Sequence, residues 1–200
     1  MKLNGKSWAV ILGLTVFFVL GYFCENAFYN LVRSSPGSGL HMFGEIGYQA
    51  GIGLYQAMLC ICLAAAGIVY KYRPCLAAGV RGILSVAASG LGVQIVKHLI
   101  GRPRPRLWAA GITHWGPSLK SGFESFPSGH TATSFALATV LAYHFPRASM
   151  VFYSLAGLVA LSRAISGAHF LTDLAGGMAL GLIVGQLWKS YWRSFFRRPR

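Results

Sequence analysis

Acidic residues are scarce in this 200-residue sequence, which has four Asp and Glu residues against 18 Lys and Arg residues. Charged residues make up only 11% of the chain, whereas soluble domains usually carry about 25%. Apolar residues, by contrast, make up 54%. The shortage of charge argues against a water-soluble globular domain and favours a chain that lies in a lipid bilayer.

The basic residues form no continuous stripe, so the net charge of +14 does not indicate a nucleic-acid-binding protein. They lie between and beyond the apolar segments, as do residues that set membrane topology or bind an anionic substrate. The four cysteines lack the spacing of zinc ligands. We therefore expect no nucleic-acid partner, no metal site, and cysteines that pack as small apolar side chains.

Apolar segments alternate with short polar ones along the whole chain, and they predict an all-α, polytopic membrane protein formed by a single domain, residues 1–200. The first span is expected to be retained, because no small-x-small cleavage site follows it. A polar connection, residues 25–47, is expected to follow. Six transmembrane helices are expected at about 8–23, 48–69, 76–100, 131–145, 150–161 and 171–188.

The distribution of basic residues predicts the orientation of these spans. With both termini in the cytoplasm, eleven of the 18 Lys and Arg residues lie on the cytoplasmic side, in agreement with the positive-inside tendency. Six spans also place the end of the third, the start of the fourth, the end of the fifth and the start of the sixth on the opposite side. Polar clusters at these four ends therefore share one outward membrane face.

The central cluster contains Ser128, Gly129 and His130 at the expected start of the fourth span. Ser128 is a good helix N-cap, and Gly129 lets the backbone approach a ligand closely. A helix N-terminus binds anions through its free N–H groups. His130 lies in the first turn, where it can donate or accept a proton. A capping turn with a surface histidine would also explain this stretch taken alone.

His169 and Asp173 are four residues apart, so on a helix they share one face. A carboxylate that accepts from one imidazole nitrogen fixes the tautomer and leaves the other nitrogen free to attack an electrophile. Asp173 is the only Asp of the chain, and a carboxylate at the start of a span requires a partner. A helix-capping Asp beside an unrelated His is the alternative for this pair.

Three cations complete a potential phosphate site. Lys97, Arg104 and Arg163 would supply the positive charge that phosphoryl transfer requires on the phosphate oxygens. Arg102 and Arg106 lie beside them, and we interpret both as interfacial residues whose charged ends reach toward water.

The three clusters resemble the signature motifs of the type 2 phosphatidic acid phosphatase superfamily, and they occur here in order within residues 97–173. They are Lys97-x6-Arg104-Pro105, Pro127-Ser128-Gly129-His130 and Ser162-Arg163-x5-His169-x3-Asp173. The resemblance implies that His169 is a nucleophile that forms a phosphohistidine, that Asp173 orients it, and that His130 protonates the leaving group and activates water. The residues implied to hold the phosphoryl group are Lys97, Arg104, Ser128, Gly129 and Arg163.

The resemblance further implies a metal-independent phosphatase of the bacterial inner membrane, without a cofactor, whose active site faces the periplasm. The implied substrates are phosphorylated membrane lipids: phosphatidate, phosphatidylglycerol phosphate, undecaprenyl diphosphate or the phosphates of lipid A. A lipid phosphotransferase that uses the same intermediate is the alternative. A vanadate-dependent haloperoxidase and a non-catalytic protein of the same fold fit less well, because the former are soluble and larger and the motifs here are complete. The sequence determines neither the lipid nor the oligomeric state.

Overall fold

The computed structural model describes residues 5–34 and 37–195, and every regular element in these ranges is helical. The elements are α1 (Gly5–Arg33), α2 (Ser38–Gly51), α3 (Gly53–Val69), α4 (Arg73–Ile100), α5 (Pro105–Trp108), α6 (Gly129–His144), the 3₁₀ turn η1 (Pro146–Ala148), α7 (Ser149–Ile165) and α8 (Leu171–Phe195). The expected all-α class is therefore found in the described part of the chain.

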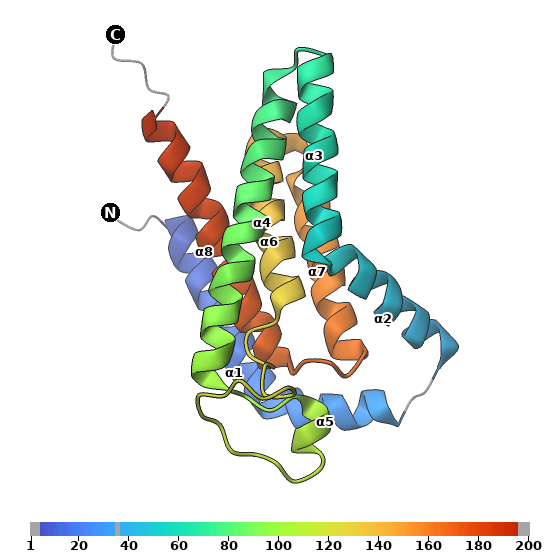
Figure 1. The fold of residues 1–200 in the computed structure, drawn as a ribbon. Helices are drawn as coiled ribbons and strands as arrows, with labels where there is room; N and C mark the ends of the chain where they lie inside the picture. Colours follow the sequence, from blue (N-terminus) through green and yellow to red (C-terminus); the bar gives the residue numbers. More distant parts are fainter. Residues whose placement is uncertain (1–4, 35–36, 196–200) are drawn as a thin grey trace.

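Helix α6 lies at the centre of the bundle and packs against α4, α7 and α8 (Figure 1). Every residue from Thr131 to Val140 is buried, and most of these residues are Ala, Thr or Ser. Small side chains allow neighbouring helices to approach closely where no hydrophobic effect drives them together. The composition of α6 thus suits a helix that is surrounded by other helices.

Glycines of α8 form the closest contact with α6. A Cβ at Gly177 would lie 2.6 Å from the carbonyl oxygen of Ser128, and Cβ atoms at Gly181 and Gly185 would collide with α6 around Ala132 and Thr139. These glycines recur every four residues and so lie on one face of α8. This close packing fixes the start of α6 against the start of α8.

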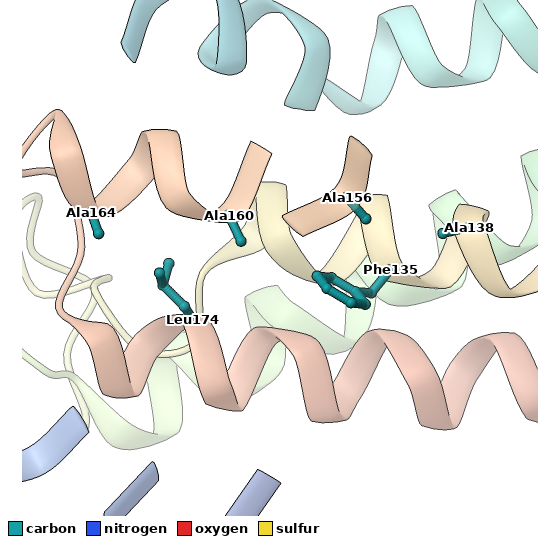
Figure 2. Close-up of a cluster of buried hydrophobic side chains, with 6 residues drawn as sticks. All are labelled: Phe135, Ala138, Ala156, Ala160, Ala164 and Leu174. Atoms are coloured by element: carbon teal, nitrogen blue, oxygen red, sulfur yellow. The ribbon is translucent and has the colours of Figure 1, made fainter. Parts of the chain in front are cut away.

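A cluster of buried apolar side chains joins α6, α7 and α8 (Figure 2). Alanines of α7 face the ring of Phe135, and Leu174 of α8 extends into the same layer. The cluster consists of Phe135, Ala138, Ala156, Ala160, Ala164 and Leu174. It holds together the three helices whose ends carry the second and third motifs.

The expected count of six spans is not confirmed. Among the described residues, four helices are long and apolar enough to cross a membrane, or five if the bent pair α2 and α3 is one span. Helix α6 has 16 residues and at 1.5 Å per residue measures about 24 Å, less than the roughly 30 Å of a hydrocarbon core. Because α6 is buried among other helices, its length and hydropathy are not set by contact with lipid.

Two expected boundaries are wrong. The polar connection expected at 25–47 is helical on both sides of a short link, because α1 continues to Arg33 and α2 begins at Ser38. The second span expected at 48–69 is broken at Ile52, where α2 and α3 meet at an angle of 55°. Lys2, Arg197, Arg198 and Arg200, which contribute to the predicted orientation, lie outside the described residues.

The three polar clusters lie at one end of the bundle (Figure 1). There α4 ends, α6 begins, α7 ends and α8 begins, and the segment with α5 crosses below them. The start of α1 and the end of α8 lie toward the opposite end. The fold therefore brings together residues that are up to 76 positions apart in the motifs, from Lys97 to Asp173.

We predict that Gly181→Ala destabilises the bundle by about 1–3 kcal/mol, the usual cost of overpacking, because its Cβ would collide with the backbone of α6. Gly157→Ala on α7 is the control, since a Cβ there meets nothing within 4 Å. In a helix, Ala is favoured over Gly by about 1 kcal/mol, so the control should be unchanged or more stable. Thermal unfolding of both variants in detergent tests this, and equal melting temperatures would contradict the packing.

Candidate active site

Gly101 ends α4 and directs the chain into the site. It has a left-handed conformation with φ of 54°, and its N–H donates to the carbonyl of Lys97 at 2.8 Å. A side chain here would collide with the carbonyl of Gly116, so the position requires glycine on two grounds. The turn places Lys97 in the last turn of α4 and Arg104 just beyond it on the same side of the bundle.

Lys97 and the start of α6 face each other. Lys97 is buried, and its Nζ would lie 3.9 Å from a Cβ at Gly129, so the ammonium group is close to the first turn of α6. Ser128 occupies the N-cap position as expected, but its side chain makes no capping hydrogen bond. Its hydroxyl instead accepts a hydrogen bond from Thr131, so the expectation of a side-chain cap is wrong.

His169 precedes α8 rather than lying on it, so the expected shared helical face is wrong. The contact nevertheless forms, with Nδ1 of His169 lying 3.5 Å from Oδ2 of Asp173. This distance is longer than a well-formed hydrogen bond. The same oxygen accepts shorter bonds from the hydroxyl of Ser125, at 2.6 Å, and from the N–H of Phe170, at 2.9 Å. Oδ2 of Asp173 is thus held in place by two donors and faces the imidazole.

Arg102 does not reach toward water, and its interpretation as an interfacial residue is wrong. Its side chain is only 4% exposed, and it donates to Asp173 at 2.7 Å and to Glu25 of α1 at 2.6 Å. A buried carboxylate without such a partner would be strongly destabilising. Arg106 is exposed, as expected of an interfacial residue.

His130 and Arg163 flank the ring of Tyr48. The imidazole of His130 stacks on Tyr48 with centroids 5.1 Å apart, and the guanidinium of Arg163 lies 5.1 Å from the same ring. Gly51 lies against His130 too closely for a side chain to fit. Helix α2 therefore covers the histidine and one of the cations.

Several buried donors in this region have no hydrogen-bond partner among the described residues. They include Nε of Arg104, Nε of Arg163 and Nε2 of His130. Arg104 also pairs with Glu124 at 3.3 Å, so part of its charge is compensated. Together with Lys97, these groups form a cationic surface rich in donors, which suits a phosphate.

Burial lowers the pKa of His169 below its ordinary value, because removing the ring from water disfavours its charged form. The positive charges of Lys97 and Arg104 act in the same direction, whereas Asp173 opposes them. At neutral pH the imidazole is therefore uncharged and retains the lone pair that a nucleophile requires.

A cavity of about 880 Å³ opens beside these cations, between the end of α1, helix α2 and the end of α7. Its lining includes Arg104 and Arg163, which are partly or fully buried, and Arg33 and Arg106, which are exposed. Neither His130 nor His169 lines this space. The cavity thus leads to the cations of the site and is large enough for more than a phosphate group.

The structure brings all eight predicted site residues to the same end of the bundle, from α4, the following loop, α6, α7 and the start of α8. The sequence interpretation missed Glu25, Ser125 and Tyr48 and misjudged Arg102. Within 5–34 and 37–195, no three His, Cys, Asp or Glu residues form a group that could hold a metal ion.

The sequence profile described as the PAP2 superfamily matches residues 78–197. A lipid A 1-phosphatase of Rhizobium johnstonii is 38% identical over 99 residues, which are 48% of this chain and 41% of that protein. Phosphatidylglycerophosphatase B of Bacillus subtilis is 33% identical over 109 residues, which are 49% of this chain and 50% of that protein. Each match thus spans half or less of the relative's own length.

Two solved structures share the fold. The transmembrane PAP2-type phosphatidylglycerolphosphate phosphatase from Bacillus subtilis aligns with a TM-score of 0.65 and 21% identity, over 96% of this chain and 98% of that one. LpxE of Aquifex aeolicus aligns with a TM-score of 0.60 and 22% identity, over 84% of this chain and 95% of that one. The helical architecture, including α1 and α2 outside the profile match, is therefore shared with that transmembrane PAP2-type phosphatase.

We predict that His169 makes the protein less stable in acid. Its pKa is lowered in the folded state, so below the ordinary value of about 6.5 the unfolded chain binds more protons and stability falls. His169→Gln lacks this contribution. The melting temperature of the wild type relative to His169→Gln should therefore fall as the pH is lowered from about 7.5 to about 5. A constant difference across this range would contradict a neutral, buried imidazole.

Proposed function

The chain belongs to the PAP2 superfamily, which confirms the resemblance seen in its sequence, and we propose that it is an integral-membrane phosphatase that hydrolyses a phosphate group of a membrane lipid. The proposal rests chiefly on the arrangement of His169, which has Asp173 at its Nδ1 and the cations Lys97 and Arg104 near it, with Arg163 near His130. This arrangement has the parts needed for covalent phosphoryl transfer: a neutral nucleophile, a group that orients it, and positive charge for the phosphate oxygens.

In the proposed first step, Nε2 of His169 attacks phosphorus and the bond to the lipid oxygen breaks. His130 gives a proton to that oxygen, and Asp173 stabilises the positive charge that develops on the attacking ring. In the second step, His130 accepts a proton from water, the water oxygen attacks phosphorus, and the P–N bond breaks to release phosphate. No metal is required for either step.

His130 has to be protonated for the first step, although it lies near three cations. A bound phosphate monoester carries about −1.5 to −2 charges at neutral pH, which offset these cations. Burial and these cations disfavour the charged form of His130, and the bound substrate favours this form relative to the empty site. This coupling would restrict proton transfer to the occupied site.

The proposed site faces the periplasm of a bacterial inner membrane. The excess of Lys and Arg on the side of the termini supports this orientation, since basic residues concentrate on the cytoplasmic side. A phosphorylated lipid would enter from the outer leaflet, with its acyl chains in the bilayer and its headgroup in the cavity beside Arg104 and Arg163.

Among the lipid phosphates that the family resemblance implies, we favour one with a large anionic headgroup, such as the phosphorylated disaccharide of lipid A. The cavity of about 880 Å³ exceeds what a single phosphate needs, and its lining includes two further arginines, Arg33 and Arg106, which are exposed. Lipid A 1-phosphatases among the relatives are in keeping with this choice.

We predict that His169→Ala lowers phosphate release by at least about a thousandfold, as expected on loss of a nucleophile, while the protein still inserts into membranes. His98→Ala is the matched control, because His98 is exposed and bonds only the backbone of Ser118. Phosphate release from lipid substrates in detergent is the measurement. Full activity of His169→Ala would disprove the assignment.

His130→Ala should separate the two chemical steps. With a phosphate ester whose leaving group needs no protonation, attack by His169 still proceeds, but water is no longer activated and the phosphoenzyme accumulates. Labelled phosphate should then remain on the protein and be absent from a His130→Ala/His169→Ala double variant. If label appears on an acceptor lipid instead of in solution, the protein is a phosphotransferase.

Arg33→Gln and Arg106→Gln should lower activity toward a lipid with a second phosphate more than activity toward phosphatidate. Each removes one exposed positive charge from the cavity lining, where we expect a second phosphate of a large headgroup to bind. Arg147→Gln, at the opposite end of α6 and α7, is the control. The ratio of kcat/KM values for the two substrates gives the answer, and an equal loss for both would argue against the headgroup assignment.

A further inference from the structure

Helix α1 lies outside residues 78–197, which the family profile matches, yet it supplies a residue to the site. It packs against the start of α8 at Gly21, where a Cβ would lie 3.3 Å from Cβ of Leu171. One turn further along α1, Glu25 is buried and accepts a hydrogen bond from the hydroxyl of Thr172. The close contact at Gly21 thus brings a carboxylate of the first helix next to Asp173.

Arg102 bridges this carboxylate and Asp173. Its Nη2 donates to Glu25 at 2.6 Å, and its Nη1 donates to Asp173 at 2.7 Å and to Thr172 at 2.6 Å. The guanidinium also lies 4.2 Å from the ring of Phe170. Planar arginine suits such a position, because its donors have a fixed geometry and it stays charged.

The buried group of Glu25, Arg102 and Asp173 carries one net negative charge. Arg102 and Asp173 alone would form a neutral pair behind His169, and such a pair would stabilise a positive imidazole only weakly. With Glu25 included, two carboxylates share one guanidinium, so the group as a whole carries a charge of −1. Few water molecules can screen this charge, because all three side chains are at most 8% exposed.

We propose that Glu25 and Arg102 are positioning residues of the active site. Arg102 fixes Asp173 so that Oδ2 faces Nδ1 of His169, and Glu25 offsets the charge of Arg102 so that the group keeps a net negative charge toward the ring. That charge stabilises the imidazole as its nitrogen bonds to phosphorus and the ring becomes positive. The inference rests on the proposed role of His169 as nucleophile.

Other charged groups also act on His169, and they come from each neighbouring element. Lys97 and Arg104 lie near it and oppose a positive ring, and His130 of α6 interacts with it as well. Asp173 is the carboxylate nearest to the ring, and Glu124 is paired with Arg104. None of these groups changes in the variants below, so their effects are common to all of the proteins compared.

The test uses Glu25→Gln, Arg102→Met and the double variant in the full-length protein. Glu25→Gln should lower kcat roughly tenfold to a hundredfold with a smaller change in KM, the range seen when partners of metal-bound histidines are removed. Arg102→Met leaves two carboxylates without their cation and should be worse. The double variant regains a charge of −1 from Asp173 alone, so its kcat should exceed that of Arg102→Met.

The pH dependence of kcat/KM gives a second measurement. Loss of the negative charge in Glu25→Gln disfavours the protonated form of His169, so the acid limb should move to lower pH. Ionisation of the substrate is the same for both proteins and cancels in the comparison. Arg147→Gln, which also removes one charge, is the control: Arg147 is exposed and lies at the opposite end of α6 and α7, so the acid limb should stay in place.

Some results would overturn the proposal while the phosphatase function stands. One such result is an active wild type together with a Glu25→Gln variant whose kcat/KM keeps the same acid limb. Another is a double variant whose kcat does not exceed that of Arg102→Met. If Arg102→Met does not fold, Arg102→Lys replaces it: this variant keeps the charge count and should lose less activity than Glu25→Gln. An inactive wild type on every lipid phosphate would instead disprove the proposed function.

Discussion

The site depends on one buried carboxylate. Asp173 is fully shielded from solvent in a bundle with few other acidic groups, and an isolated negative charge there would be unstable. Arg102, Ser125 and the N–H of Phe170 together stabilise it. All three donors lie in loops between the helices. These loops therefore have to take defined conformations. The position of His169 follows from the same contacts.

Close helix packing supports this arrangement. Helix α6 is built of small residues and α8 presents glycines toward it, so the two helices can approach until their backbones are nearly in contact. Their N-terminal ends, which carry His130 and Asp173, are therefore fixed relative to one another. In a bilayer, such packing replaces the hydrophobic effect that would hold a soluble core together.

Much of the site could be predicted because motif spacing carries the information. Lys97, Arg104, His130, Arg163 and His169 are polar residues at the ends of apolar segments, and alternation of the spans places these ends together. The role of Arg102 was missed because an arginine that reaches toward water and an arginine that is buried can stand in the same local sequence. Only the contact with Glu25, which the sequence does not reveal, shows that Arg102 is buried. Glu25 itself was assigned to a loop, because a carboxylate within a span requires a partner. That partner, Arg102, is 77 residues away in the sequence and could not be recognised from it.

The boundaries of α2 and the number of spans could not be predicted from the sequence either. Polar and Gly-rich residues at 34–47 indicated a loop, but tertiary contacts with α7 stabilise a helix there. Helix α6 looked like a short span because hydropathy does not distinguish contact with lipid from contact with other helices.

The bond between Glu25 and Thr172 joins the first long helix of the chain to the last. During synthesis, α1 enters the membrane long before α8 has been translated, and its carboxylate has neither Arg102 nor Thr172 to accept from. The nascent protein therefore carries an uncompensated acidic group in its first segment until Arg102 has been made, and the bond to Thr172 forms only when α8 follows. The buried group around Asp173 is thus complete only when the bundle is complete, and a chain that stops short of α8 cannot form it.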